Sequence, residues 1–172
     1  ETDSHHHVPP IVIMGVAGAG KTDVGSMLAD RLGVDFMDGD DLHPQANIDK
    51  MTSGHPLNDK DRRPWLTNIA AWLAEHADNG AVVACSALKR IYRDQLRQVC
   101  PDLVFIHLAG DRKVVAARVE ARAGHFMPAS LIDSQYATLE PLAANEVGIT
   151  VDFDAPREEL TTKAAAWLAD AD

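Results

Sequence analysis

Residues 15–22 of the chain read GVAGAGKT and follow directly on the apolar run PPIVIM of residues 9–14. The octet matches the pattern G-x-x-x-x-G-K-[ST] at every fixed position, between a strand-like run and a helical pattern. Glycines at these positions let successive backbone N–H groups turn inward around phosphate oxygens, at the positive end of a helix dipole. The stretch therefore predicts a phosphate-binding loop (P-loop) that holds a nucleotide.

In such a loop the lysine, here Lys21, bridges the β- and γ-phosphates, and the hydroxyl of Thr22 ligates Mg²⁺. An ordinary glycine-rich turn is the disfavoured alternative, because motif and context agree. The predicted nucleotide-binding residues of the loop are Gly15, Val16, Ala17, Gly18, Ala19, Gly20, Lys21 and Thr22.

Short apolar runs alternate with helical patterns along the whole chain. The runs at 11–14, 34–37, 81–85, 103–108 and 148–153 are nearly continuous in apolar character, as in strands covered on both faces. This alternation predicts an α/β P-loop fold with three layers: a parallel five-stranded sheet with helices on both faces. We expect residues 1–10 to be a disordered arm or tag remnant and residues 11–172 to form a single domain.

The composition excludes several classes of partner. Sixteen Lys and Arg against 26 Asp and Glu give a formal net charge of -10, which disfavours nucleic acid and anionic membranes as partners. The sequence shows no signal-peptide pattern and no apolar stretch long enough to span a bilayer, so we expect a cytoplasmic protein. Cys85, in the run AVVACSAL, is expected to be a buried thiol.

Residues 38–44, DGDDLHP, place carboxylates at the end of the second strand, on the edge where such sheets bind ligands. We predict that one of Asp38 and Asp40 faces a metal while the other faces an acceptor hydroxyl. Asp41 is expected to be a solvated acidic residue. For His43 two interpretations stay open, a hydrogen bond to a ligand and a cap on the helix that follows.

Residues 58–66, NDKDRRPWL, predict a helix that begins near Asn and Asp and carries adjacent arginines. Neighbours on a helix point about 100° apart, so only one of Arg62 and Arg63 can face a site. The alternative is a solvated pair bound to Asp59 or Asp61. We expect the substrate-binding segment to span about residues 39–66.

Residues 85–93, CSALKRIYR, follow the third strand and carry Ser86 where many P-loop ATPases have a metal-binding Asp. This departure disfavours ordinary nucleotide-hydrolysing machines and leaves the metal role to Asp38. Lys89 and Arg93 lie i,i+4 on one predicted helix face, either to hold an anionic substrate or as surface charges. The first interpretation is favoured for Lys89 and the second for Arg93.

Residues 111–126 place Arg118 and Arg122 on one helix face that leads into a loop hinged at Gly124. A mobile segment that carries arginines over bound phosphates excludes water and neutralises charge in phosphoryl transfer. We predict a lid at about residues 118–130, with Arg122 catalytic and His125 binding substrate; the alternative is an amphipathic helix with solvated arginines.

The segments GVAGAGKT, DGDDLHPQANIDKMTSGHPLNDKDRRPWL, CSALKRIYRDQLR, ARAGHFM and LEPL, in this order, resemble the gluconokinases of bacteria and eukaryotes. These are small P-loop kinases related to shikimate kinase and to the nucleoside monophosphate kinases, which close a lid over their substrates. The resemblance covers about residues 12–159, and the segments after the P-loop are far more specific than the P-loop itself.

The resemblance implies phosphorylation of the 6-hydroxyl of D-gluconate by ATP, with Mg²⁺. It implies that Asp40 faces the acceptor, that Asp38 touches Mg²⁺ through water, and that Arg62 is the substrate-facing arginine. Arg118 would lie on the adenine, with Pro156 opposite, and family members are often homodimers. The substrate-binding residues expected from motifs and resemblance together are Asp40, His43, Arg62, Lys89 and His125.

Three alternatives remain. A kinase for another small hydroxy acid such as shikimate is disfavoured, because that relative carries a Gly-rich run where this chain has CSALKR. A nucleoside monophosphate kinase would need a longer base-binding segment. A nucleotide-dependent switch without an acceptor explains neither the paired Asp residues nor the lid arginines.

Overall fold

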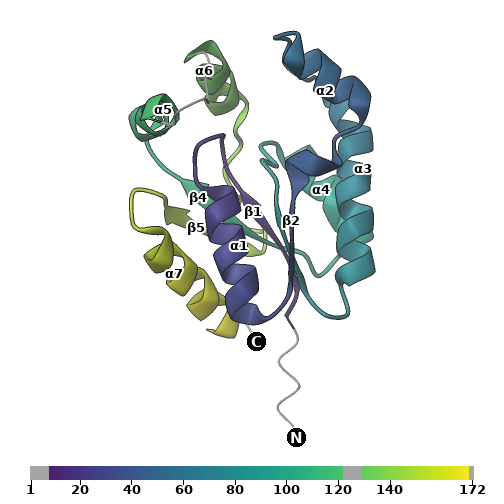
Figure 1. Cartoon of the computed structure of the whole chain (residues 1–172). Coiled ribbons are helices and arrows are strands. Elements are labelled where there is room, and N and C mark those ends of the chain that lie inside the picture. Colours follow the sequence, from purple (N-terminus) through teal and green to yellow (C-terminus); the bar gives the residue numbers. More distant parts are fainter. Residues whose placement is uncertain (1–7, 122–128, 171–172) are drawn as a thin grey trace, which may run out of the picture.

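The computed structural model describes residues 8–121 and 129–170 and is built around one parallel sheet (Figure 1). Its five strands lie in the order β2-β3-β1-β4-β5, so the predicted fold class is confirmed. Every strand begins and ends within one residue of its predicted bounds. The strands are β1 (Pro10–Met14), β2 (Asp35–Asp38), β3 (Ala81–Ala84), β4 (Val104–Ala109) and β5 (Gly148–Asp152).

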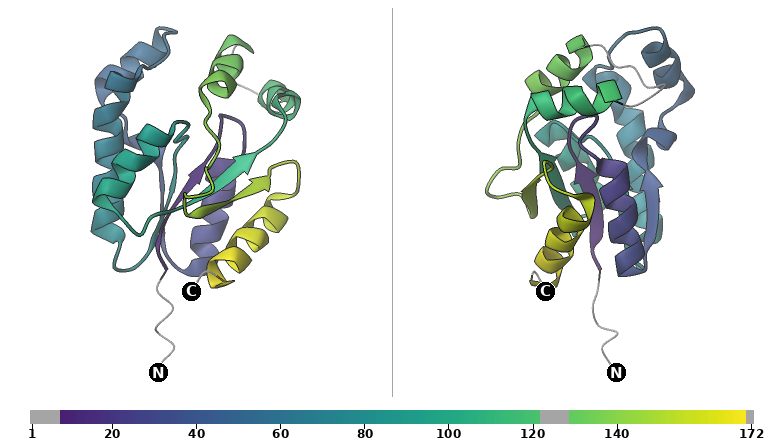
Figure 2. Two further views of the ribbon diagram at one scale, coloured as in Figure 1. Left: turned by 180° about the vertical axis from the view of Figure 1, so that it is seen from behind. Right: turned by 60° about the vertical axis from the view of Figure 1, so that its left-hand side comes forward.

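Helices cover both faces of the sheet, as Figures 1 and 2 show. The first face carries α1 (Lys21–Leu32) and α7 (Arg157–Asp170), and the second carries α3 (Asp59–His76) and α4 (Arg90–Val99). Three further helices, α2 (Gln45–Thr52), α5 (Arg112–Ala121) and α6 (Ala129–Thr138), stand beyond the carboxyl edge of the sheet. There α2 lies on one side and α5 with α6 on the other.

Two apolar cores follow from the alternation of side chains along the central strand. In β1, Ile11 and Ile13 pack beneath α1 and α7, while Val12 and Met14 pack beneath α3 and α4. All four side chains are fully buried, because β1 lies in the middle of the sheet. Cys85, directly after β3, is buried as predicted, and burial raises the pKa of its thiol to about 12.

The loops at the carboxyl edge are brought together by backbone contacts. Gly15 N–H donates to the carbonyl of Ser86 at 3.2 Å, so the P-loop and the loop after β3 lie side by side. Gly39 opens a short 3-10 helix, η2 (Gly39–Leu42), at a point where a Cβ atom would lie 2.5 Å from the Ala84 carbonyl oxygen. A glycine is therefore required there for η2 to pack against the end of β3.

The start of α3 confirms the predicted helix signal. Asn58 caps the helix by accepting from the Asp61 N–H at 2.8 Å, and the Asp61 carboxylate accepts from the Asn58 N–H at 3.0 Å. Asp61 also pairs with Lys50 of α2 at 2.5 Å, and Asn47 donates to the Asp61 carbonyl at 2.8 Å. This capping box therefore fixes both the first turn of α3 and the position of α2 beside it.

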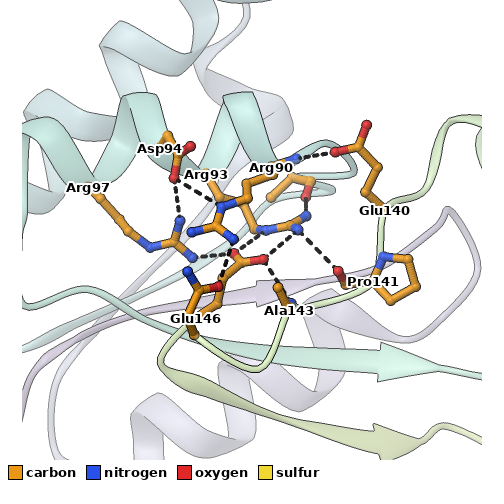
Figure 3. A network of polar contacts seen from close by, with 10 residues as sticks. Arg90, Arg93, Asp94, Arg97, Glu140, Pro141, Ala143 and Glu146 are labelled. Atoms are coloured by element: carbon orange, nitrogen blue, oxygen red, sulfur yellow. Dashed lines mark hydrogen bonds and ion pairs between the residues drawn. The ribbon is translucent and has the colours of Figure 1, made fainter.

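A buried ion pair holds α4 against the segment between α6 and β5 (Figure 3). Arg93, predicted to be a surface charge, is fully buried and donates to both carboxylate oxygens of Glu146, at 2.7 and 2.9 Å. Arg93 also donates to the Ala87 carbonyl at 2.8 Å, and Arg97 also pairs with Glu146. Burial alone would raise the pKa of Glu146, but the hydrogen bonds from Arg93, from the Ala143 N–H and from Arg97 hold it at about 2. The surface interpretation of Arg93 was wrong because its partner lies 53 residues away in the sequence.

His107 of β4 is a second polar group in the core. Its side chain is 2% exposed, and neither ring nitrogen has a hydrogen-bond partner among the described residues. Burial, followed by the charges of Arg93 and Lys21, lowers its pKa to about 4. The imidazole is therefore neutral at pH 7.

This histidine predicts acid sensitivity of the fold. As pH falls from about 6.5 to about 4, the unfolded chain takes up a proton at His107 that the folded chain does not bind, so the free energy of unfolding falls. Between pH 7 and pH 5 we expect the wild type to lose about 2 kcal/mol more than His107→Leu does. Urea unfolding of both proteins at the two pH values measures this difference. Equal losses of unfolding free energy in the two proteins would show that His107 is not the group responsible for the acid sensitivity.

None of the described helices combines the length and the apolar character needed to cross a membrane.

Candidate active site

A cavity of about 1130 Å³ opens at the carboxyl edge of the sheet, above the end of β1. Its walls come from the P-loop, η2, the start of α3, α5, α6 and the segment after β5. Of the predicted site residues, those that line it are Ala17, Gly18, Ala19, Gly20, Lys21, Thr22, Asp38, Asp40, His43, Arg62 and Arg118. One cavity thus joins the predicted nucleotide loop to most of the predicted substrate residues.

The P-loop wraps around its own lysine. Lys21 Nζ donates to the carbonyls of Gly15 and Val16 at 3.0 and 2.9 Å, which directs the side chain back over the loop. Gly20, at φ 95°, turns the chain into α1, so the N–H groups of this first turn face the cavity at the positive end of the helix. Burial lowers the pKa of Lys21, and the nearby charges of Asp40, Cys85 and Asp38 act against this effect.

The two predicted metal-binding residues are in contact. Thr22 Oγ1 donates to Asp38 Oδ2 at 3.2 Å, while Asp38 Oδ1 accepts from the Asp40 N–H at 3.0 Å. Hydroxyl and carboxylate oxygens are the hard donors that Mg²⁺ takes in addition to phosphate and water. The pair therefore fits a Mg²⁺ ion bound together with a nucleotide.

Asp40 and Asp41 differ as predicted. Both side chains are exposed, but Asp40 lines the cavity beside Lys21, whereas Asp41 lies outside the cavity lining. Desolvation of the Asp40 carboxyl raises its pKa. The charge of the Lys21 ammonium acts in the opposite direction but is the weaker effect. A carboxyl with a raised pKa binds a proton more tightly. Asp40 therefore has the stronger proton affinity that a base needs, in the cavity where the acceptor hydroxyl would lie.

His43 is fixed by packing, and it does not cap α2. Its ring stacks on Trp65 at a centroid distance of 4.2 Å, and its Nδ1 lies 3.2 Å from Nδ2 of Asn47. Trp65 Nε1 in turn donates to the Gly39 carbonyl at 2.7 Å. Burial, followed by the charge of Arg62, lowers the pKa of His43 to about 4, so a neutral imidazole lines the cavity.

Only one of the adjacent arginines faces the site, as predicted. Arg62 lines the cavity and donates through Nη1 to the Leu57 carbonyl at 2.7 Å and to the Tyr92 hydroxyl at 3.1 Å. Arg63 is exposed and lies outside the cavity lining. The alternative pairing of Arg62 with Asp59 or Asp61 does not occur, because these carboxylates pair with Lys89 and Lys50.

Lys89 is placed differently from the prediction. It directly precedes α4 and lies outside the cavity lining, with Nζ 3.0 Å from Asp59 Oδ1 and 3.3 Å from Oδ2. The side chain is therefore held by a carboxylate of α3, and the structure does not bring it into the cavity with Arg62. The sequence could not indicate this, because Lys89 and Asp59 are 30 residues apart.

Arg118 of α5 crosses between the P-loop and the segment after β5. Its Nη2 donates to the Phe153 carbonyl at 2.6 Å, and its Nη1 lies 3.5 and 3.4 Å from the carbonyls of Gly18 and Ala19. The guanidinium also lies over the Phe153 ring, 5.0 Å from the centroid. Pro156 precedes α7 and lies outside the cavity lining, although Ala155 and Arg157 on either side belong to it. Contact of Arg118 and Pro156 with adenine stays a prediction.

Two predicted lid residues, Arg122 and His125, lie outside the described residues. The cavity also contains a residue that the sequence did not indicate. Gln135 of α6 lines the cavity, and its Oε1 accepts from the Ala17 N–H of the P-loop at 2.6 Å. A glutamine in an otherwise unremarkable helix carries no motif, so only the fold reveals this contact.

Comparison with known proteins places the chain among small kinases. The family model described as shikimate kinase matches residues 17–162. The chain is 46% identical over 160 residues to the thermoresistant gluconokinase of Escherichia coli K12, covering 91% of this chain and 90% of that protein. It is 51% identical over 143 residues to the gluconokinase of Gluconobacter oxydans 621H, covering 82% and 80%. A crystal structure of a gluconokinase from Sinorhizobium meliloti 1021 superposes with a TM-score of 0.89 at 45% identity, covering 96% of this chain and 94% of that one.

Proposed function

Because this chain belongs to the shikimate kinase family and has gluconokinases as its close relatives, we propose that it is itself a gluconokinase. It transfers the γ-phosphate of ATP to the 6-hydroxyl of D-gluconate and releases 6-phospho-D-gluconate and ADP. The single observation that carries this proposal is the joint lining of one cavity by the P-loop, Asp40 and Arg62. A nucleotide site, a proton acceptor and a cation for a carboxylate are what this reaction needs.

Different residues of the cavity would carry out different parts of the phosphoryl transfer. The 6-hydroxyl oxygen of gluconate forms a bond to the γ-phosphorus while the bond from that phosphorus to the β,γ-bridging oxygen breaks. Asp40 orients the hydroxyl and takes up its proton, a role supported by the raised pKa of its carboxyl. Lys21 neutralises charge on the phosphate oxygens, with Arg122 of the predicted lid assigned to the same task.

Thr22 and Asp38 would hold Mg²⁺, a role supported by their contact at 3.2 Å. When bound, the ion supplies charge neutralisation for the phosphates of ATP. Arg118 and Pro156 are proposed for the adenine, and Arg62, His43 and His125 for gluconate. The homodimer, the lack of a nucleic-acid partner and the cytoplasmic location stay predictions.

A coupled ADP-release assay tests the function directly. We expect turnover with D-gluconate, and a product that co-elutes with 6-phospho-D-gluconate, in a panel that also holds other aldonates, glucitol, shikimate and nucleoside monophosphates. Turnover with shikimate in place of gluconate would support the other hydroxy-acid kinase. ATP binding without turnover on any acceptor would support a nucleotide-dependent switch.

A further inference from the structure

Arg62 is held on one side only. Its Nη1 carries two N–H bonds, and both are used, toward the Leu57 carbonyl at 2.7 Å and the Tyr92 hydroxyl at 3.1 Å. Its Nε and Nη2 make no hydrogen bond to the described residues. These two nitrogens form the edge of the guanidinium that binds a carboxylate through two parallel hydrogen bonds. The fold thus leaves a bidentate edge of Arg62 available in a residue that lines the cavity.

The direction of the Tyr92–Arg62 hydrogen bond is set by a third residue. The Tyr92 hydroxyl has one proton, and it donates that proton to Asp59 Oδ1 at 2.5 Å. An ionised carboxylate only accepts hydrogen bonds, so the Tyr92 oxygen is left as an acceptor toward Arg62. Hydrogen bonds from Tyr92 and from Lys89 hold the pKa of Asp59 below its usual value, which keeps the carboxylate ionised at neutral pH.

Lys89 completes this arrangement. Its ammonium contacts both oxygens of Asp59 and lies 5.7 Å from the centre of the Tyr92 ring, while the Arg62 guanidinium lies 5.4 Å from the same centre. Tyr92 is buried, with 3% of its surface exposed, so it forms a rigid support between the two cations. The four side chains come from the start of α3 and the start of α4, which are far apart in the sequence.

We propose that Tyr92, Asp59 and Lys89 are positioning residues that orient Arg62, so that its Nε–Nη2 edge receives the carboxylate of the sugar acid. The proposal rests on the proposed function, since it assumes an acceptor that carries a carboxylate. It assigns Lys89 an indirect role, through Asp59 and Tyr92. These residues therefore set the preference for acids over neutral polyols of the same length.

The variant Tyr92→Phe keeps the ring and removes the hydroxyl. We expect its KM for gluconate to rise about tenfold, while its KM for ATP and its kcat stay within about twofold of wild type. Its rate ratio of gluconate to the neutral polyol glucitol should fall by a similar factor. Lys89→Met and Asp59→Asn should change the same two quantities in the same direction, and they replace Tyr92→Phe if that protein does not fold.

The chain offers a matched control in its other tyrosine. Tyr136→Phe also loses one hydroxyl hydrogen bond, to the Gly110 carbonyl at 2.8 Å, but Tyr136 does not contact Arg62. We expect its KM for gluconate to equal that of wild type. An equal rise in both Tyr→Phe variants would indicate a general structural effect and would overturn the proposal.

A double variant separates this inference from the proposed function. If Tyr92 acts through Arg62, Tyr92→Phe should add nothing to the rise in the KM for gluconate caused by Arg62→Ala. A full additional rise in the double variant, or no rise in Tyr92→Phe beside a large one in Arg62→Ala, would refute the positioning role. If Arg62→Ala itself left this KM unchanged, the role of Arg62 in gluconate binding would fail, and the positioning role with it. A wild-type protein inactive on gluconate would instead refute the proposed function.

Discussion

Replacing Asp40 by Asn is expected to lower turnover of gluconate by about two to four powers of ten, with little change in nucleotide affinity. Asparagine keeps the shape of the side chain and can still hydrogen-bond a hydroxyl, but it cannot accept its proton. Asp40 lines the cavity beside Lys21, where the acceptor hydroxyl would meet the γ-phosphate. The measurement is steady-state kinetics, with ATP affinity determined separately by titration.

The pH dependence of the same variant sharpens the test. Desolvation raises the pKa of Asp40, so the activity of the wild type should fall on acidification at a pH above the ordinary range of an aspartate. Asp40→Asn should lack that acidic limb. Asp41→Asn, which alters a carboxylate one residue along and outside the cavity lining, should match wild type in rate and profile. If the two variants behaved alike, or if Asp40→Asn mainly weakened ATP binding, another residue would be the proton acceptor.

Lys21→Ala is expected to lower phosphoryl transfer by at least about three powers of ten while the fold stays intact. The Lys21 ammonium is the P-loop cation that points over the loop, and its hydrogen bonds to described residues go to the backbone carbonyls of Gly15 and Val16. Its loss therefore removes charge neutralisation at the phosphates and costs the fold little. Turnover and melting temperature of the purified variant are the two measurements.

Lys163→Ala is the control for this change. Lys163 lies on α7, where it pairs with Glu159 four residues earlier at 3.2 Å, and it does not line the cavity. Its removal should leave both turnover and melting temperature close to wild type. Near-normal turnover in a folded Lys21→Ala protein would contradict the assignment of the ATP site.

Local patterns in the sequence were sufficient to predict the sheet and the P-loop. The apolar runs, the glycines of residues 15–20 and the caps at Asn58 and Asp61 all act over a few residues, so their structural meaning can be read without the fold. Thr22 in the first turn of α1 and Asp38 at the end of β2 were both predicted as metal ligands, and the structure brings them into contact at the carboxyl edge of the sheet.

The polar pairings between distant segments could not be predicted in this way. Arg93 and Lys89 lie four residues apart on one chain segment and have the same sign of charge, yet one is buried against Glu146 and the other holds Asp59. What separates them is the position of α4 relative to α3 and to the segment before β5. The contact of Gln135 with the P-loop could not be predicted for the same reason, since its partner is a backbone N–H 118 residues earlier.

β1 is the first strand of the chain and lies in the middle of the sheet, so it is synthesised before both of the strands that flank it. β1 ends at Met14, but its neighbours β3 and β4 end at Ala84 and Ala109. On the ribosome the first strand emerges long before either neighbour exists, and β2 also waits for β3. The strand before the P-loop therefore lacks its second neighbour until residue 109 has left the exit tunnel, and the contact of the loop with Gln135 forms later still, so nucleotide binding is a late event in synthesis. Until then the apolar strand that carries the P-loop is an open edge, and nascent chains that stall in this interval are the ones most exposed to aggregation.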